Sequence, residues 1–310
     1  MRVLVTGSNG LLGTRLLAVL LQRPQVAVLA ASRGPCTNRY LGEFPYFPLD
    51  ITDSAQVARL VAAVAPDVVV HTAALTDVDR CEREPERAWL VNVRATEWVA
   101  EACARQGALL VHLSSEYVFD GQAGPYAETD PPRPLSVYGR TKLASEQIVA
   151  QRCARWIVAR TTVLFGYAPG TRGNFVLWLL DRLARGERTR VVVDQVGSPT
   201  LADNLAEMLL ALIEGGGQGI YHTVGASRLS RYEFARLAAA VFGLDTQLIE
   251  PVTTRELGQV APRPLRAGLL TRRLEAEFPS VPVLTARAAL ERLRDQLAAV
   301  GQQVALRPTS

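Results

Sequence analysis

The sequence predicts an α/β protein in which a doubly wound parallel sheet precedes a smaller C-terminal α/β lobe. Three observations support this. Short, continuous apolar runs alternate with amphipathic stretches through the first half of the chain. A glycine-rich turn follows the first apolar run directly. The alternation changes after Gly166, where helical stretches dominate. Apolar runs separated by helices are typical of parallel strands covered on both faces.

The first half of the chain supplies the main sheet. Its apolar runs lack a polar face, as expected for strands buried on both sides. The expected strands are 2–7, 25–32, 67–74, 108–115 and 155–166. The expected helices are 12–23, 54–65, 84–107 and 136–153. Asp53 or Ser54 is a suitable N-cap for the second of these helices, and Gly107 is a suitable end for the third.

The second half is expected to form a separate lobe. We place a dinucleotide-binding domain at 1–165 and a substrate-binding domain at 166–310, with some elements of the second returning to the first. The expected helices are 173–187, 201–216 and 230–243, the last capped by Ser230. The expected strands are the start of 189–200, which then turns, and 219–225. The chain from about residue 301 is polar and is expected to be loose.

The composition and charge of the chain indicate a globular protein and bear on its partners. The chain has 310 residues, 48% of them hydrophobic and 21% charged, which is typical of a globular protein. Its net charge of +4 is spread without a dense basic block, which argues against a nucleic-acid partner and is compatible with an anionic small ligand. No apolar run approaches the ~20 residues that span a bilayer. We therefore expect neither a nucleic-acid nor a membrane partner, while a homodimer is compatible with the sequence.

The cysteines and the N-terminus point to the cytoplasm. None of the four cysteines has the spacing of a metal knuckle or a CxxC pair, so we expect reduced thiols and no metal site. The three histidines form no spaced cluster, and interior positions explain them. The first strand begins at Arg2, so we expect no signal peptide before it.

The run "VTGSNGLLG" predicts a nucleotide-binding loop. It places Gly7, Gly10 and Gly13 between the first strand and the first helix, with the spacing GxxGxxG. Glycines let the backbone turn tightly and approach a pyrophosphate, and the helix N-terminus supplies N–H donors with positive potential. The strand–turn–helix context favours binding over a purely structural turn, and it makes the sheet Rossmann-type.

The ends of the next strands indicate which dinucleotide is bound. The second strand ends in Ser32 and Arg33, where an acid would hold a free ribose 2′-hydroxyl. An arginine suits a 2′-phosphate, so NADPH is favoured, NADH stays open, and a surface arginine without a ligand is the simpler alternative. Asp50 and Ile51 follow the next strand, beside the expected adenine. The small residues of 71–74 permit close passage of the cofactor.

Tyr138 and Lys142 carry the candidate chemistry. Their i, i+4 spacing places both side chains on one helical face. An ammonium near a phenol lowers the pKa of the phenol, which makes Tyr138 a proton donor or acceptor. Lys142 is also suited to holding the nicotinamide ribose. Ser115 ends a strand, at the edge where open α/β sheets bind ligands, and could hold the substrate oxygen beside Tyr138.

Two neighbours of Ser115 leave alternatives open. Tyr117 has Gly121 instead of a base at i+4, so it either packs in the interior or lines a substrate pocket. Glu116 is either a simple charge at the pocket rim or an acceptor for sugar hydroxyls.

These motifs resemble the extended short-chain dehydrogenase/reductases and, more narrowly, the dTDP-4-dehydrorhamnose reductase family. The likeness covers nearly the whole chain. "TGSNGLLG", "SSEYVFDG" and "YGRTKLASE" are similar to the family's glycine loop, its Ser-Thr-Asp-Tyr-Val-Phe-Asp-Gly run and its Tyr/Lys helix. The more specific matches lie in the second half, in "VVVDQVGSPT", "GIYHTVG", "SRYEFA" and "PRPLRAGL".

The resemblance implies a role for each matching residue. The implied catalytic group is Ser115, Tyr138 and Lys142. The implied cofactor contacts are Gly10, Leu11, Leu12, Asp50, Ile51, Ala73 and Ala74, which add to Gly7, Gly13, Ser32, Arg33, Tyr138 and Lys142 from the motifs above. The implied substrate contacts are Ser115, Glu116, Tyr117, Val163 and Arg263, the last against the diphosphate.

The chain departs from the family pattern around the pocket. A family tryptophan falls on Val163, and a family tyrosine falls on Leu75. Glu116 stands where the family usually has aspartate. The asparagine and serine of the C-terminal motif fall on Arg266 and Ala267. These changes bear on which sugar is bound, and they leave the catalytic group intact.

The implied reaction is NADPH-dependent reduction of a nucleotide-linked 4-keto sugar, most simply dTDP-4-dehydrorhamnose to dTDP-L-rhamnose. This would be a step of dTDP-rhamnose biosynthesis for cell-envelope polysaccharide. Two alternatives stay open. One is a sugar-nucleotide epimerase or dehydratase that regenerates its cofactor. The other is a non-catalytic NADP-binding subunit resembling the one associated with methionine adenosyltransferase.

Overall fold

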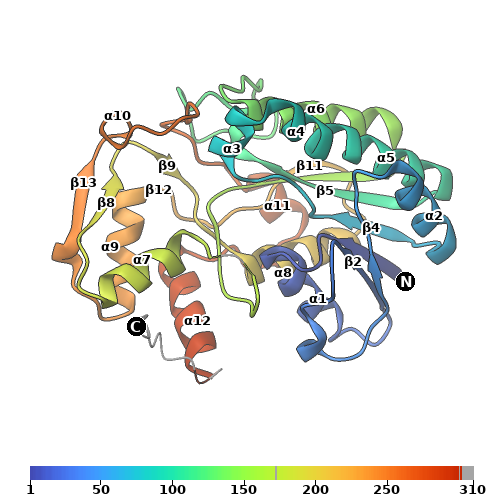
Figure 1. Cartoon of the computed structure of the whole chain (residues 1–310), viewed down its shortest axis with the longest axis horizontal. Coiled ribbons are helices and arrows are strands. Elements are labelled where there is room, and N and C mark those ends of the chain that lie inside the picture. The colour runs from blue at the N-terminus through green and yellow to red at the C-terminus, as the bar shows by residue number, and fades with distance from the viewer. Residues whose placement is uncertain (172, 300, 302–310) are drawn as a thin grey trace.

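A seven-stranded parallel sheet forms the centre of the molecule (Figure 1). The computed structural model describes residues 1–171, 173–299 and 301. The strands follow the order β11-β6-β5-β4-β1-β2-β3, and every neighbouring pair is parallel. Their bounds are β1 Arg2–Thr6, β2 Ala27–Ser32, β3 Tyr46–Pro48, β4 Val68–His71, β5 Leu109–Ser115, β6 Trp156–Thr161 and β11 Gly219–His222. This arrangement confirms the predicted fold class.

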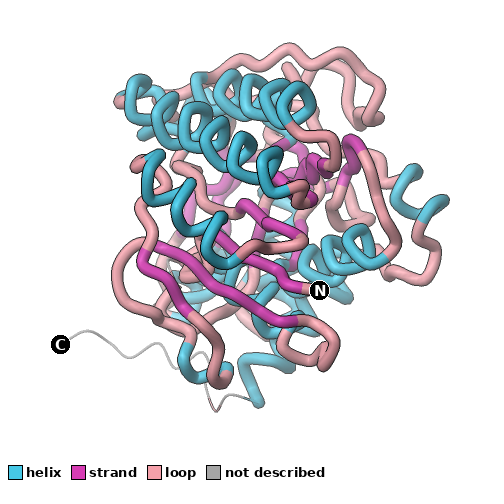
Figure 2. Tube along the Cα trace, turned by 90° about the vertical axis from the view of Figure 1, so that its right-hand side faces the viewer, coloured by secondary structure: helices cyan, strands magenta, loops and turns pink. Residues whose placement is uncertain are grey.

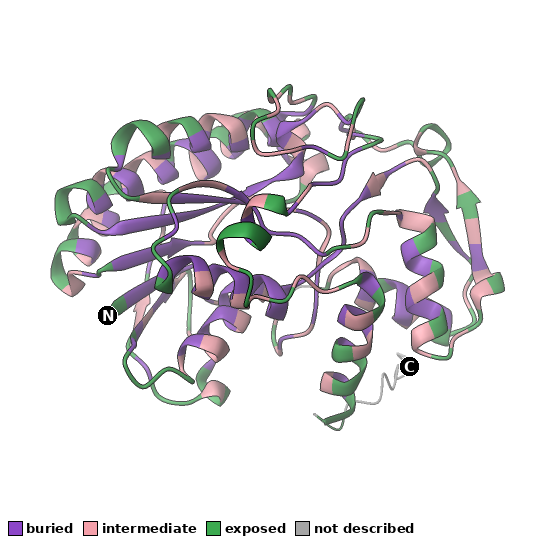
Figure 3. Ribbon diagram, turned by 180° about the vertical axis from the view of Figure 1, so that it is seen from behind, coloured by how far each residue is buried: buried purple, intermediate pink, exposed green. Residues whose placement is uncertain are grey.

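Helices cover both faces of this sheet (Figures 1 and 2). One face packs on α1 (Leu11–Leu20), α8 (Ala202–Glu214) and α11 (Arg272–Glu277). The other packs on α2 (Ser54–Val64), α5 (Ala95–Gln106) and α6 (Val137–Arg152). The central strands are buried throughout, which Figure 3 shows as purple ribbons between helices with green outer faces. The doubly covered sheet explains why these runs carry no polar face.

The predicted helix caps are present in the structure, but one predicted helix is divided. Asp53 caps α2, because its side chain accepts a hydrogen bond from the Gln56 amide. Ser230 and Glu233 form a reciprocal capping box at the start of α9 (Arg231–Val241). The expected helix over 84–107 is instead divided. It forms α4 (Pro85–Trp89), a π-helical turn (Leu90–Arg94) and then α5, and the π turn places a functional side chain described below.

A smaller lobe is built mainly from the second half of the chain. Its core joins α7 (Phe175–Ala184), α9 and α12 (Ala286–Ala299) to a two-stranded parallel pair, β8 (Thr189–Val192) and β13 (Ile249–Val252). The remaining short elements are α3 Val78–Arg83, α10 Thr254–Leu257, β7 Leu164–Phe165, β9 Val196–Gly197, β10 Thr200–Leu201 and β12 Leu229–Ser230. Because β11 and α8 pack with the main sheet, residues after 166 contribute to both lobes.

Candidate active site

The turn from β1 into α1 leaves no room for a side chain at Gly7 or Gly13. Gly7 has a φ of +71°, and a Cβ on it would lie 2.7 Å from the backbone nitrogen of Ala73. A Cβ on Gly13 would lie 2.4 Å from the Gly7 carbonyl oxygen. Gly10 is the N-cap residue and caps α1 without any side-chain hydrogen bond, so the first amides of the helix are open to an anion. The predicted glycine loop therefore has the shape that a pyrophosphate requires.

The residues on either side of Gly10 bear on how this loop would bind a phosphate. The Ser8 hydroxyl is buried and has no hydrogen-bond partner. Leu12 packs into the core against the sheet, so any contact with a ligand from this residue would use its backbone N–H. Leu11 is only partly buried. A buried hydroxyl without a partner is costly, which is consistent with a ligand oxygen completing it.

The ends of β2 and β3 meet beside this loop. Ser32 is the last residue of β2, and Arg33 is exposed after it, with no ion-pair partner in the part of the chain that the structure describes. Asp50 accepts hydrogen bonds from the amide (2.9 Å) and the hydroxyl (2.7 Å) of Thr52. These bonds lower the pKa of Asp50, so it stays a carboxylate. Ile51 is buried against the sheet.

Asn92, in the π-helical turn, fixes the segment that follows β4. Its side-chain oxygen accepts a hydrogen bond from the Leu75 amide at 2.8 Å. Its side-chain nitrogen donates to the Leu75 carbonyl (3.0 Å) and to the Thr141 hydroxyl (3.1 Å). The segment with Ala73 and Ala74 is thereby tied to α6 between the two candidate catalytic residues. Periodicity alone could not identify Asn92, because its position depends on the π turn.

Ser115 and Tyr138 are brought together although they lie far apart in the sequence. Ser115 ends β5, and its hydroxyl accepts a hydrogen bond from the Tyr117 amide at 3.3 Å. Tyr138 lies in the first turn of α6, which Ser136 caps. Burial raises the pKa of Tyr138, and hydrogen bonding to Ser115 partly opposes this effect. The predicted lowering of this pKa by Lys142 is therefore wrong, because burial raises the pKa and Lys142 is not among the groups that shift it.

Lys142 lies one turn further along α6 and is 3% exposed. Burial lowers its pKa to about 8, while the Glu146 carboxylate acts in the opposite direction. His71 and His112 stack on each other at 5.7 Å, and burial lowers the pKa of both. The imidazoles near Lys142 are therefore neutral and do not repel its ammonium. The predicted interior positions of the histidines are confirmed, since His222 is buried as well.

A buried ion pair lies behind Lys142. Arg160 of β6 donates two hydrogen bonds to the Glu146 carboxylate, at 2.9 and 2.7 Å. Ser114 donates a third bond to the same carboxylate. The guanidinium also lies over the Phe119 ring, 5.1 Å from its centroid. No motif in the sequence pointed to this group, which joins β5, β6 and α6 at the level of Lys142.

The side chains of Tyr117 and Glu116 lie in different surroundings. The Tyr117 ring meets the Tyr138 ring edge-on, with 5.5 Å between the centroids. Glu116 is 4% exposed, and its carboxylate accepts hydrogen bonds from the Thr162 hydroxyl and the Gly268 amide. Burial raises the pKa of Glu116, against these bonds and the nearby Arg231 and Arg228 guanidinium groups. The alternative of a simple rim charge is wrong, because the side chain is buried.

A narrow pocket lies between the two lobes beside Tyr117. Val163 lines it in a left-handed conformation with φ of +45°, which is strained for a β-branched residue. Arg231 also lines it, and no ion pair holds this residue within 1–171, 173–299 and 301. The full lining is Glu116, Tyr117, Val163, Gln195, Val196, Gly197, Arg231 and Pro264.

Arg263 lies next to the residues that line this pocket, in the buried part of the 262–269 segment. It donates a hydrogen bond to Asp79 of α3 at 2.8 Å, and its side chain is 8% exposed. The second terminal nitrogen of its guanidinium is buried without a partner. Burial raises the pKa of Tyr117, and the nearby Arg231 and Arg263 guanidinium groups partly oppose this effect. The pocket beside Tyr117 therefore has a cationic side.

Comparison with known proteins identifies the family. The model described as "RmlD substrate binding domain" matches residues 1–299. A dTDP-4-dehydrorhamnose reductase of Mycobacterium tuberculosis (strain CDC 1551 / Oshkosh) is 38% identical over 278 residues, covering 87% of this chain and 85% of that protein. The chain belongs to the dTDP-4-dehydrorhamnose reductase family. The resemblance inferred from the motifs is thus confirmed.

Solved structures of dTDP-4-dehydrorhamnose reductases have the same fold. The enzyme of Clostridium acetobutylicum ATCC 824 is 30% identical, with a TM-score of 0.85, and covers 96% of this chain and 100% of its own. The enzyme of Bacillus anthracis str. Ames, in complex with NADP, is 30% identical with a TM-score of 0.84, covering 95% and 99%. A UDP-glucose 4-epimerase of Thermus thermophilus, at 23% identity and TM-score 0.79, shares the fold and covers 95% of this chain and 99% of its own.

Metal-binding clusters, disulfides and membrane spans are not features of the described residues. No group of three or more His, Cys, Asp or Glu side chains gathers there in a way that could hold a metal ion. The cysteines are free thiols, and three of the four are buried. In the same residues, no helix combines the length and apolar character that crossing a bilayer requires.

Proposed function

We propose that this member of the dTDP-4-dehydrorhamnose reductase family reduces a nucleotide-linked 4-keto sugar with NADPH, and that dTDP-4-dehydrorhamnose is its most direct substrate. The observation that carries the proposal is the closeness of Ser115, at the end of β5, to Tyr138 in the first turn of α6, at the carboxyl edge of the sheet. Lys142 lies one turn further along α6, and the open N-terminus of α1 is on the same edge. Reductases of this name among the relatives support the same reaction.

The chain's own groups fit a bound NADP(H). Gly7 and Gly13 let the loop pack closely against its own backbone and Ala73, and the buried Ser8 hydroxyl of the same loop lacks a partner. Arg33 follows β2 where a free ribose would require an acid, which favours a 2′-phosphate. The NADP complex of the Bacillus anthracis relative supports this cofactor. When bound, NADPH supplies the hydride for C4 of the sugar.

Proton transfer falls to Tyr138. Its hydroxyl would donate a proton to the oxygen at C4, while Ser115 holds that oxygen by a hydrogen bond. Because burial raises the pKa of Tyr138, the phenol is protonated at neutral pH and suits the role of acid. Lys142 would bind the nicotinamide ribose and stabilise the phenolate that remains. Tyr117, Val163 and Arg263 are the proposed substrate contacts, whereas both carboxylate oxygens of Glu116 already accept hydrogen bonds from the protein.

The alternatives receive less support. Epimerases and dehydratases among the structural neighbours are under 25% identical, so they share the fold only. A non-catalytic subunit would not require Ser115, Tyr138 and Lys142 to lie together. The homodimer and the cytoplasmic location stay predictions.

The test is NADPH oxidation with a panel of nucleotide 4-keto sugars. Tyr138→Phe is expected to lower kcat at least about 100-fold, because the proton donor is lost, with NADPH affinity within about twofold of wild type. Tyr232→Phe, in α9 of the second lobe, is the matched control and should keep wild-type turnover. Near wild-type turnover by Tyr138→Phe would contradict the assignment, as would reduction of no sugar in the panel.

A further inference from the structure

Glu116 is the residue around which the two lobes meet. It follows Ser115 directly and precedes Tyr117, yet its carboxylate is buried among groups from distant parts of the chain. The Thr162 hydroxyl, just after β6, donates to one carboxylate oxygen. The Gly268 amide donates to the other at 3.1 Å. Each oxygen therefore has a protein donor from a different segment.

The second lobe offers a two-segment ribbon to this carboxylate. Val196 of β9 donates its amide to the Leu265 carbonyl at 2.7 Å, and the Ala267 amide donates to the Val196 carbonyl at 3.1 Å. Gly268, the next residue, is the one that binds Glu116. The same ribbon contributes Val196 and Gly197 to the pocket wall. Holding Gly268 therefore holds one wall of the pocket against the end of β5.

Gly197 shows how closely the ribbon approaches. A Cβ built on Gly197 would lie 3.0 Å from Oε1 of Glu116 and 3.3 Å from Oε2. The φ of Gly197 is not positive, so its backbone would accept alanine, and the carboxylate alone occupies the space. A side chain at residue 197 would force the carboxylate or the ribbon to move by a few tenths of an ångström. The two residues are complementary in size.

From this geometry we propose that Glu116 is a positioning residue of the reductase site, in a lobe clasp made of Glu116, Thr162, Gly197 and Gly268. The effect of this clasp on catalysis rests on the proposed function. It fixes the pocket wall at the distance from Ser115 and Tyr138 that the reaction requires. The guanidinium groups of Arg231 and Arg228 place positive charge near the carboxylate, and this charge offsets part of the free energy that burying the carboxylate costs.

The first experiment removes the clasp without touching the carboxylate or a proposed substrate contact. Thr162→Val deletes one donor and is expected to lower kcat about tenfold, since small displacements of the reacting groups are costly. KM for the keto sugar and Kd for NADPH should stay within about twofold of wild type. Unchanged kcat in Thr162→Val would overturn the positioning role.

The second experiment is a double-mutant cycle between Glu116 and Gly197. Gly197→Ala is expected to lower both kcat and the urea midpoint, because its methyl group clashes with the carboxylate. In a Glu116→Asp background the shorter side chain leaves space, and the same alanine should then cost at least about threefold less in kcat. Gly173→Ala is the matched control, since a Cβ there meets nothing within 4 Å. Equal costs in both backgrounds would overturn the proposal.

These measurements distinguish the lobe clasp from a direct contact between Glu116 and the sugar. They also test the clasp independently of the proposed function. If Glu116→Asp raises KM alone and leaves kcat unchanged, Glu116 is a plain ligand and the positioning role is wrong. The urea midpoints need no substrate. They reveal whether Glu116 and Gly197 are coupled even if the wild-type chain reduces no sugar in the panel, a result that would contradict the proposed function instead.

Discussion

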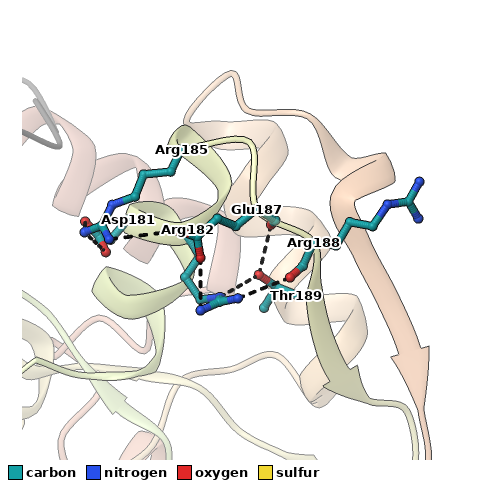
Figure 4. A network of polar contacts seen from close by, with 6 residues as sticks. All are labelled: Asp181, Arg182, Arg185, Glu187, Arg188 and Thr189. Carbon is teal, nitrogen blue, oxygen red and sulfur yellow. Dashed lines mark hydrogen bonds and ion pairs between the residues drawn. The ribbon is translucent and has the colours of Figure 1, made fainter. Parts of the chain in front are cut away.

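Two groups of charged side chains use the same arginine–carboxylate chemistry in opposite surroundings. Beneath α6, Arg160 and Glu146 are 2% and 4% exposed. At the end of α7, Arg185 and Asp181 are 39% and 35% exposed, within the network of Figure 4 that extends to Glu187, Arg188 and Thr189. Burial strengthens the attraction within a pair but removes the water that would hydrate each charge alone. The interior group should therefore control stability and the protonation of Lys142, and the exposed group should control little.

The largest effect is expected from breaking the interior pair. Glu146→Gln keeps the shape of the side chain but leaves the Arg160 guanidinium buried without a counter-charge. We expect the free energy of unfolding to fall by about 3–5 kcal/mol, measured by urea unfolding at neutral pH. A loss of unfolding free energy below about 1 kcal/mol would contradict this prediction. Exposed ion pairs contribute amounts in that range, so burial would then make no difference between the two groups.

The second prediction concerns Lys142, a buried cation for which the described residues provide no ion pair. Between its folded pKa of about 8 and the ordinary lysine value of 10.5, Lys142 has released its proton in the folded chain but keeps it in the unfolded chain. The unfolded state then binds more protons, so this residue makes stability rise with pH through that window.

Lys142→Met should abolish this contribution. The variant is expected to be more stable than wild type by about 3 kcal/mol below pH 8, with the difference vanishing toward pH 10.5. Urea unfolding at several pH values between 7 and 10.5 measures both chains. A difference that does not change with pH would mean that Lys142 is not held below its ordinary pKa.

Ser114 tests a smaller contribution to the interior group. Ser114→Ala removes one of the three hydrogen bonds to the Glu146 carboxylate and leaves the two from Arg160 in place. A hydrogen bond to a charged group contributes about 1.5–3 kcal/mol, and we expect a loss in that range in urea unfolding. A neutral result would indicate that the arginine alone satisfies the carboxylate.

The smallest effect is expected at the surface. Asp181→Asn removes the carboxylate that accepts from Arg185 at 2.7 Å. The loss of unfolding free energy should be about 0.2–1 kcal/mol and should shrink further in about 1 M salt, where exposed charges are screened. A loss that matched Glu146→Gln would contradict the role assigned to burial.

Motifs of a few residues allowed much of the site to be predicted. The glycine loop and the Tyr138/Lys142 spacing are local patterns, and Ser115 follows from its place at the end of an apolar run. Asn92 could not be found in this way, because a π turn sets its direction. Arg160 and Arg231 gave no signal either, since an isolated arginine in a sequence is most simply a surface residue.

The sequence by itself determined the alternation of the main strands and helices in the first half, the nucleotide-binding loop and the caps at Asp53 and Ser230. Backbone geometry and side chains within a few residues decide these features. Only the tertiary structure decided the charge states and the clasp. Lys142 reaches a pKa of about 8 because surrounding elements exclude water from it. Glu116 meets Gly268, 152 residues away, because the two lobes pack at the edge of the sheet. Such interactions depend on groups that are close in space and remote along the chain.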